Sequence, residues 1–207
     1  MIVFAILAIT SQTAAPSAAE FFPMKPGMVW EYETTGDGAG TYTQQIGAAV
    51  DAGGTMRAPM VIKIAGKEIQ STFYELTPTG VFVIGHEPKK LFAKPQPVFQ
   101  TGEKGAKWDF IGPSPYEDDK EARLVIKGES KWAGQRNVLG QKRDCLVVKT
   151  ENRIGLSEST ATLFKNEAVY AKDVGLVEMD ETVQFGKTQH KRHVRLVKFD
   201  PGQVPGE

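Results

Sequence analysis

The sequence predicts an all-β protein, a single antiparallel sheet of about ten strands curled into a barrel or half-barrel. Apolar side chains recur at every second position along most of the chain, which is the period of a half-buried strand. Glycine and polar turn residues separate these runs at short intervals, and strands joined by tight turns are antiparallel. No run of about eleven residues repeats apolar positions at helical spacing, so we expect little or no helix beyond one turn at 115–121.

The first strand shows the pattern most clearly. Met28, Trp30 and Tyr32 fall on one face, and Glu31 and Glu33 fall on the other. The same alternation predicts strands near residues 28–35, 40–49, 56–65, 68–77, 80–86, 106–111, 121–132, 143–153, 158–165, 174–185 and 188–199.

Two segments interrupt this rhythm. Prolines and glycines set among lysines make 87–105 the longest expected loop, and a loop of that length is either mobile or functional. The tail 201–207, with two prolines and two glycines, is expected to be disordered. We therefore assign one β domain to residues 20–200.

The N-terminus has the features of an export signal. An apolar run at 2–9 leads into small residues at 13–19, with no charge before Glu20. The run is shorter than the roughly 20 residues that span a membrane but fits a signal peptide, so we expect no integral membrane span. Ser17 and Ala19 fit the cleavage positions, which makes 1–19 the signal, and a cut after Ala15 is the second choice.

The export interpretation leaves an alternative. No basic residue precedes the apolar run, although signals normally begin with positive charge, and the run could instead be a first strand or short helix of the domain. Cys145, the one cysteine, is far from this segment and cannot carry a lipid there. We expect a periplasmic or extracellular protein without a lipid anchor.

Composition excludes several classes of protein. The 25 basic residues balance 25 acidic ones, which argues against a nucleic-acid binder and a polybasic membrane-surface protein. A single cysteine forms no internal disulfide. Cys145 lies in an apolar β-type run and is expected to be a small buried hydrophobe.

Two motifs carry a resemblance. Residues 22–32 (FPMKPGMVWEY) and 170–178 (YAKDVGLVE) resemble the opening and closing motifs of small exported bacterial all-β proteins, aromatic-Pro-x-x-x-Gly-x-x-Trp-x-Tyr and Tyr-Ala-x-x-Val-Gly-Leu-Val. The stretch 132–148 is similar to a third shared feature, although Gln135-Arg136 replaces its small-aromatic pair. The resemblance implies an all-β exported domain of uncharacterised function and supplies no catalytic residues. Aromatic and aliphatic residues at strand spacing are usually core, so both motifs are interpreted as fold determinants.

No metal, cofactor or catalytic site is expected. His190 and His193 are an odd number apart and face opposite sides of a strand, and His86 is remote in sequence. The acidic run 117–119 lacks the ligand spacing of a calcium loop.

Nucleophile signals are also weak. Ser114 and Ser157 both lack the Gly-x-Ser-x-Gly turn. The glycines at 36, 38 and 40 lie between two strands, as in a hairpin, and do not form a phosphate loop. Glu181 is the one charged residue in the inner-face pattern of 174–185.

Two classes of function remain. A barrel can hold an apolar small molecule or lipid on its concave face, with 87–105 covering the mouth, and this predicts a cavity. The alternative is a non-catalytic structural or interaction module of the cell envelope, with a closed core and a docking face at the basic patch 191–195, which could also be a protected sheet edge. Carboxylates such as Glu31 and Glu33 would support an enzyme only if the fold gathered them with others in a cleft.

Overall fold

The computed structural model describes residues 17–87, 90–116, 121–157 and 160–202. The apolar run of the predicted signal, the acidic run 117–119 and most of the expected tail, 203–207, lie outside the described residues. So does most of the helical turn expected at 115–121. The one helix among the described residues, α1 (Ala18–Phe21), is a single short turn and is not long enough to cross a membrane.

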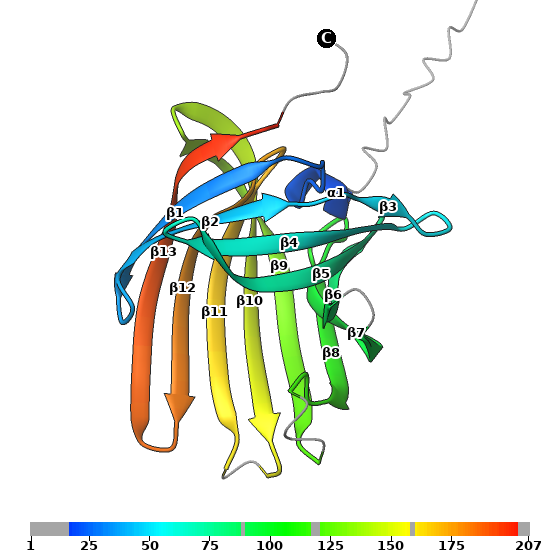
Figure 1. The fold of residues 1–207 in the computed structure, drawn as a ribbon, viewed down its shortest axis with the longest axis vertical. Coiled ribbons are helices and arrows are strands. Elements are labelled where there is room, and N and C mark those ends of the chain that lie inside the picture. The colour runs from blue at the N-terminus through cyan, green and yellow to red at the C-terminus, as the bar shows by residue number, and fades with distance from the viewer. Residues whose placement is uncertain (1–16, 88–89, 117–120, 158–159, 203–207) are drawn as a thin grey trace, which may run out of the picture.

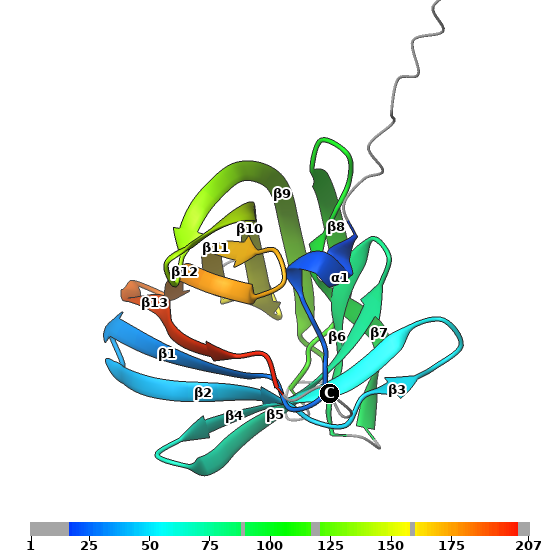
Figure 2. The same cartoon turned by 90° about the horizontal axis from the view of Figure 1, so that it is seen from above.

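The chain forms one antiparallel sheet nearly closed into a barrel (Figure 1, Figure 2). Its strand order is β7-β6-β5-β4-β2-β1-β13-β12-β11-β10-β9-β8, and the short β3 pairs with β4. The strands are β1 (Val29–Gly36), β2 (Gly40–Ile46), β3 (Val50–Asp51), β4 (Met56–Ile64), β5 (Lys67–Thr77), β6 (Gly80–Glu87), β7 (Lys90–Gln100), β8 (Ala106–Pro113), β9 (Arg123–Val138), β10 (Gln141–Gly155), β11 (Thr162–Ala171), β12 (Gly175–Phe185) and β13 (Thr188–Asp200). The all-β prediction is confirmed, with thirteen strands where about ten were expected.

The expected loop at 87–105 is the main error, because β7 occupies most of it. β7 is an end strand of the sheet order, and an end strand tolerates Pro95 and Pro97 because their missing N–H groups remove no ladder bond from a central strand. Phe99 of β7 is fully buried. The segment therefore forms a wall of the barrel and does not cover its mouth.

Side chains bridge β7 and β8, the two ends of the strand order. Lys94 Nζ donates to Ile111 O at 3.1 Å and lies 4.8 Å from the centre of the Phe110 ring. Ser130 Oγ of β9 donates to Gln100 O at 2.6 Å. The barrel closes here through individual side chains, whereas ladders join its other neighbouring strands.

The N-terminal segment fills one end of the barrel. Ser17 caps α1 in a capping box with Glu20, and the buried Ala18 donates its N–H to Pro78 O at 3.0 Å. The Phe21 ring lies 5.2 Å from that of Trp132. Phe22 follows among three further aromatic rings, those of Tyr74, Phe99 and Tyr170. Because four of these six rings are buried and the other two pack against them, this end of the barrel is a packed core.

The two motifs of the resemblance contact each other at this end. Trp30 Nε1 donates to Val174 O at 2.5 Å, and Tyr32 Oη donates to Leu176 O at 3.0 Å. Val174 ends the turn before β12 and Leu176 lies at the start of β12. Between them Gly175 has a φ of +95°, a conformation that favours glycine. Side chains from the beginning of the chain thus satisfy carbonyls near its end, which agrees with a fold-determining role for both motifs.

Candidate ligand-binding cavity

A cavity of about 350 Å³ lies on the concave face of β9–β12, opposite β5–β7. Most of its lining residues are aliphatic or aromatic, and a smaller group is polar. The lining comprises Tyr74, Val83, Gln96, Pro97, Val98, Pro115, Tyr116, Leu124, Ile126, Val148, Thr150, Asn152, Ile154, Phe164, Asn166, Ala168, Tyr170, Met179 and Glu181. The cavity begins where the aromatic core of the N-terminal segment ends, since Tyr74 and Tyr170 belong to both.

Strand register places a row of residues, most of them polar, across the concave face. Six residues, each paired with the next on the neighbouring strand, make up this row, here named the polar row: Trp108, Gly128, Thr150, Asn166, Glu181 and Arg192. Glu181 forms an ion pair with Arg192, and Asn166 Nδ2 donates to Thr150 Oγ1 at 3.4 Å. Thr150, Asn166 and Glu181 of this row line the cavity, so hydrogen-bonding groups cross a lining that is mostly apolar.

Three polar atoms at or beside the polar row lack partners. Asn152 Oδ1, Asn166 Oδ1 and Trp108 Nε1 are buried from solvent and make no hydrogen bond within the described part of the chain. Asn152 lies one row further along β10, opposite Phe164. An unsatisfied buried polar group costs about 1–3 kcal/mol. Most buried polar atoms in proteins have a hydrogen-bond partner, so these three atoms call for an explanation.

Four tyrosines lie in the packed core or against it, and two of them, Tyr74 and Tyr170, also line the cavity. Burial raises the pKa of Tyr42 and of Tyr74 to about 12. Burial also raises the pKa of Tyr32 and Tyr170. All four phenols are neutral at physiological pH and can act as hydrogen-bonding groups but not as bases.

The outer face of β8–β12 carries a separate trough of about 590 Å³. Charges of opposite sign face each other across its strands in two rows, Lys107-Glu129-Lys149-Glu167 and Asp109-Lys127-Glu151-Lys165. A slip of two residues between β9 and β10 in either direction would place Lys149 opposite Lys127 or Lys131, and like charges directly opposite each other are destabilising. The trough thus favours the observed register.

Two carboxylates of this trough are held in the ionised form. A hydrogen bond from Lys131 lowers the pKa of Glu129, and one from Arg153 lowers the pKa of Glu151. Both groups remain ionised at neutral pH, whereas a general acid needs a raised pKa. Of Glu31 and Glu33, the two carboxylates considered from the sequence, Glu33 forms an ion pair with Arg195 at 2.9 Å.

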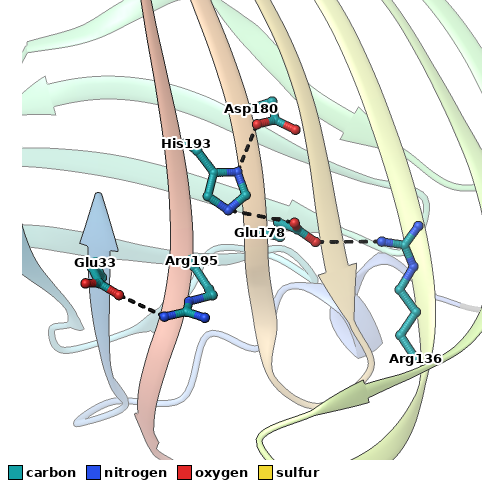
Figure 3. A network of polar contacts seen from close by, with 6 residues as sticks. All are labelled: Glu33, Arg136, Glu178, Asp180, His193 and Arg195. Atoms are coloured by element: carbon teal, nitrogen blue, oxygen red, sulfur yellow. Dashed lines mark hydrogen bonds and ion pairs between the residues drawn. The ribbon is translucent and has the colours of Figure 1, made fainter. Parts of the chain in front are cut away.

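The basic patch at 191–195 lies in the middle of the sheet. β13 pairs with both β1 and β12, so the interpretation as a protected sheet edge is wrong. Figure 3 shows Arg195 against Glu33, and His193 between Asp180 at 2.9 Å and Glu178 at 3.8 Å. Because neighbouring carboxylates balance these groups, the patch presents little net positive charge to a partner.

The remaining sequence candidates have ordinary surroundings. No group of three or more His, Cys, Asp or Glu residues among those described could hold a metal ion. Ser114 Oγ accepts a hydrogen bond from the N–H of Tyr116, and Ser157 Oγ lies 3.0 Å from Thr160 Oγ1. Cys145 is buried, and burial raises the pKa of its thiol, which fits a small core residue.

Sequence reasoning missed most of the polar row. It identified Glu181 as an exception on the inner face, but Asn152 and Asn166 were not singled out. The signal that could have found them is the two-residue alternation of each strand. Both asparagines occupy the inward positions of their strands, alongside apolar neighbours such as Phe164 and Ala168.

Comparisons with known proteins identify no family. No protein-family model matches the sequence, and no curated protein matches it. A candidate lipoprotein from Parabacteroides distasonis has a similar structure, with a TM-score of 0.50, 13% identity, and coverage of 89% of this chain and 99% of its own. A candidate exported protein with a YmcC-like fold from Bacteroides fragilis has a TM-score of 0.46 and 12% identity, and the match covers 87% of this chain and 98% of its own. At such identities the likeness supports the fold alone.

Proposed function

We propose that this protein is an exported, non-catalytic binding module that holds an apolar small molecule or lipid on the concave face of its sheet. The observation that carries the proposal is the cavity of about 350 Å³ next to a packed core. Ligand pockets commonly measure about 300–1,000 Å³, so this one suits a small ligand or one chain of a larger one. A domain with a purely structural role would have no need for such a space.

Charge supports an apolar or neutral ligand. Glu181 is the one ionisable acid or base of the ordinary pH range in the cavity lining, and Arg192 pairs with it. A charged ligand would lose its hydration without meeting an unpaired opposite charge.

Export is supported by the apolar run at 2–9, and it agrees with the description of the similar structure from Parabacteroides distasonis as a lipoprotein. Two cleavage points were considered, and the fold bears on the choice between them. A cut after Ala19 would remove Ser17 and Ala18, which cap and anchor α1, whereas a cut after Ala15 would keep both. N-terminal sequencing of protein from the envelope fraction distinguishes the two, and a chain that retains Met1–Ala19 would overturn export.

Binding can be tested with a neutral fluorescent probe, N-phenyl-1-naphthylamine. We expect its fluorescence to rise on mixing with the purified protein, and expect Ala168→Leu to reduce the rise because Ala168 lines the cavity and is 5% exposed. Glu167→Leu, one residue away on the outer face, serves as the matched control and should bind the probe as the wild type does. Native mass spectrometry of the envelope-purified protein then shows whether a natural ligand is retained.

The competing proposal is a structural or interaction module of the envelope. It predicts no rise in probe fluorescence and a clean mass for the unliganded chain. Equal binding by the Ala168→Leu variant and the wild type would place the probe elsewhere and count against the cavity.

A further inference from the structure

We propose that the cavity selects a neutral amphiphile whose polar end carries hydroxyl groups, with Asn152 and Asn166 as its hydrogen-bond acceptors. This inference rests on the proposed binding function and specifies its ligand class. The observation behind it is the pair of amide oxygens, Asn152 Oδ1 and Asn166 Oδ1, that accept no hydrogen bond within the described residues although both residues line the cavity. The two oxygens are buried as placed, so a ligand hydroxyl meets them when the amide groups turn toward the cavity.

Position makes the two amides a plausible single subsite. Asn166 pairs with Thr150 across β10 and β11, and Asn152 follows two residues after Thr150 on the same face. Diagonal neighbours of this kind are about 7–8 Å apart between backbones, within reach of side chains that lean together. Two vicinal hydroxyl groups could therefore donate one hydrogen bond to each amide oxygen.

The chemistry of the acceptors sets the class of the head group. An unpaired carbonyl oxygen requires a donor, which a hydroxyl supplies and an ether or ester does not. A cationic amine would find Glu181 already paired with Arg192. An anionic head group would meet no Lys, Arg or His in the cavity lining and would bring no proton to the two amide oxygens. A neutral polyol meets the requirement without burying a charge.

The apolar part of the ligand has its own surface. Leu124, Ile126, Ile154 and Phe164 line the cavity on the side of the polar row where β10 ends and β11 begins. These strand ends lie at the lower end of the sheet in Figure 1, away from α1. A hydrocarbon chain placed there would extend toward that end while its hydroxyls stay at the polar row.

The test compares 1-O-decylglycerol with its 2,3-di-O-methyl ether, which keeps the chain and the oxygens but has no donor. Each compound displaces N-phenyl-1-naphthylamine from the wild type, from Asn152→Leu/Asn166→Leu and from the surface control Asn137→Leu. We expect the wild type and the control to bind the diol at least about 10-fold more tightly than the ether, and the double variant to bind both equally. The double variant loses the long hydrogen bond from Asn166 to Thr150 but also removes two unsatisfied oxygens, so its melting temperature should change little.

The outcomes separate the two proposals. Equal binding of diol and ether by the wild type, or a preference that survives in the double variant, overturns the hydroxyl subsite and leaves the cavity function standing if the probe binds. Failure of the probe and both amphiphiles to bind overturns both proposals. If the double variant does not fold, each single variant must reduce the preference, and two unchanged single variants refute the assignment.

Discussion

The bond from Tyr32 to Leu176 offers a direct test of how the two ends of the chain hold the barrel together. Tyr32 is 1% exposed, and its hydroxyl donates to Leu176 O at 3.0 Å. Tyr32→Phe removes one oxygen atom, with little change in volume, and leaves that carbonyl without its partner. Tyr42, whose ring is 5.1 Å from that of Tyr32, makes no side-chain hydrogen bond to another described residue and gives the matched control, Tyr42→Phe.

The magnitude follows from the hydrogen bond. A lost intramolecular hydrogen bond costs about 1 kcal/mol, and an unsatisfied buried carbonyl raises the cost toward 3 kcal/mol. We expect Tyr32→Phe to lower the free energy of unfolding by about 2 kcal/mol, which for a domain of this size lowers the melting temperature by about 4–8 °C. Tyr42→Phe should change the free energy of unfolding by less than about 0.5 kcal/mol.

Urea unfolding followed by circular dichroism and tryptophan fluorescence measures both variants. Unchanged m-values would show that the comparison concerns the native state. The reasoning would be refuted if Tyr32→Phe and Tyr42→Phe lost the same stability, or if Tyr32→Phe lost less than about 0.5 kcal/mol.

Two further predictions concern the tyrosines and the polar row. Burial raises the pKa of Tyr42 and Tyr74 to about 12, whereas unfolded tyrosines ionise near pH 10. Their contribution to stability is therefore complete below about pH 10. Between about pH 10 and 12 the free energy of unfolding falls by up to about 1.4 kcal/mol per pH unit for each tyrosine. An alkaline circular dichroism titration should show this loss, Tyr74→Phe should move its midpoint to higher pH, and an unmoved midpoint would contradict the assignment. Gly128→Ala should cost about 1–3 kcal/mol because the added Cβ would overlap the Trp108 indole. In urea unfolding, Gly128→Ala should cost less stability in the Trp108→Leu background than in the wild type. An equal loss in both backgrounds would show that the clash does not involve Trp108.

Local sequence patterns predicted the β architecture because a strand exposes alternate faces to different surroundings. The alternation of Trp30 and Tyr32 with glutamates was enough to orient β1. The same reasoning failed at β7, where Pro95 and Pro97 look like loop residues. Their tolerance depends on the strand standing at the end of the sheet order, which is a fact about neighbours and not about the segment itself.

The cavity was foreseen in kind but not in composition. A curled sheet implies a concave face, yet no local pattern indicates that Thr150, Asn166 and Glu181 lie side by side. They are separated along the chain by one strand-to-strand connection each, and pairing alone brings them into one row.

The amino-acid sequence by itself determined the fold class, the absence of a disulfide and the neutral charge balance, because composition and a two-residue period are local properties. Tertiary structure alone decided that β7 is a wall, that Trp30 and Tyr32 bind carbonyls near Val174, and that two asparagines share a cavity. Those outcomes depend on which strands become neighbours and in what register, and that choice is made by the whole sheet as it closes.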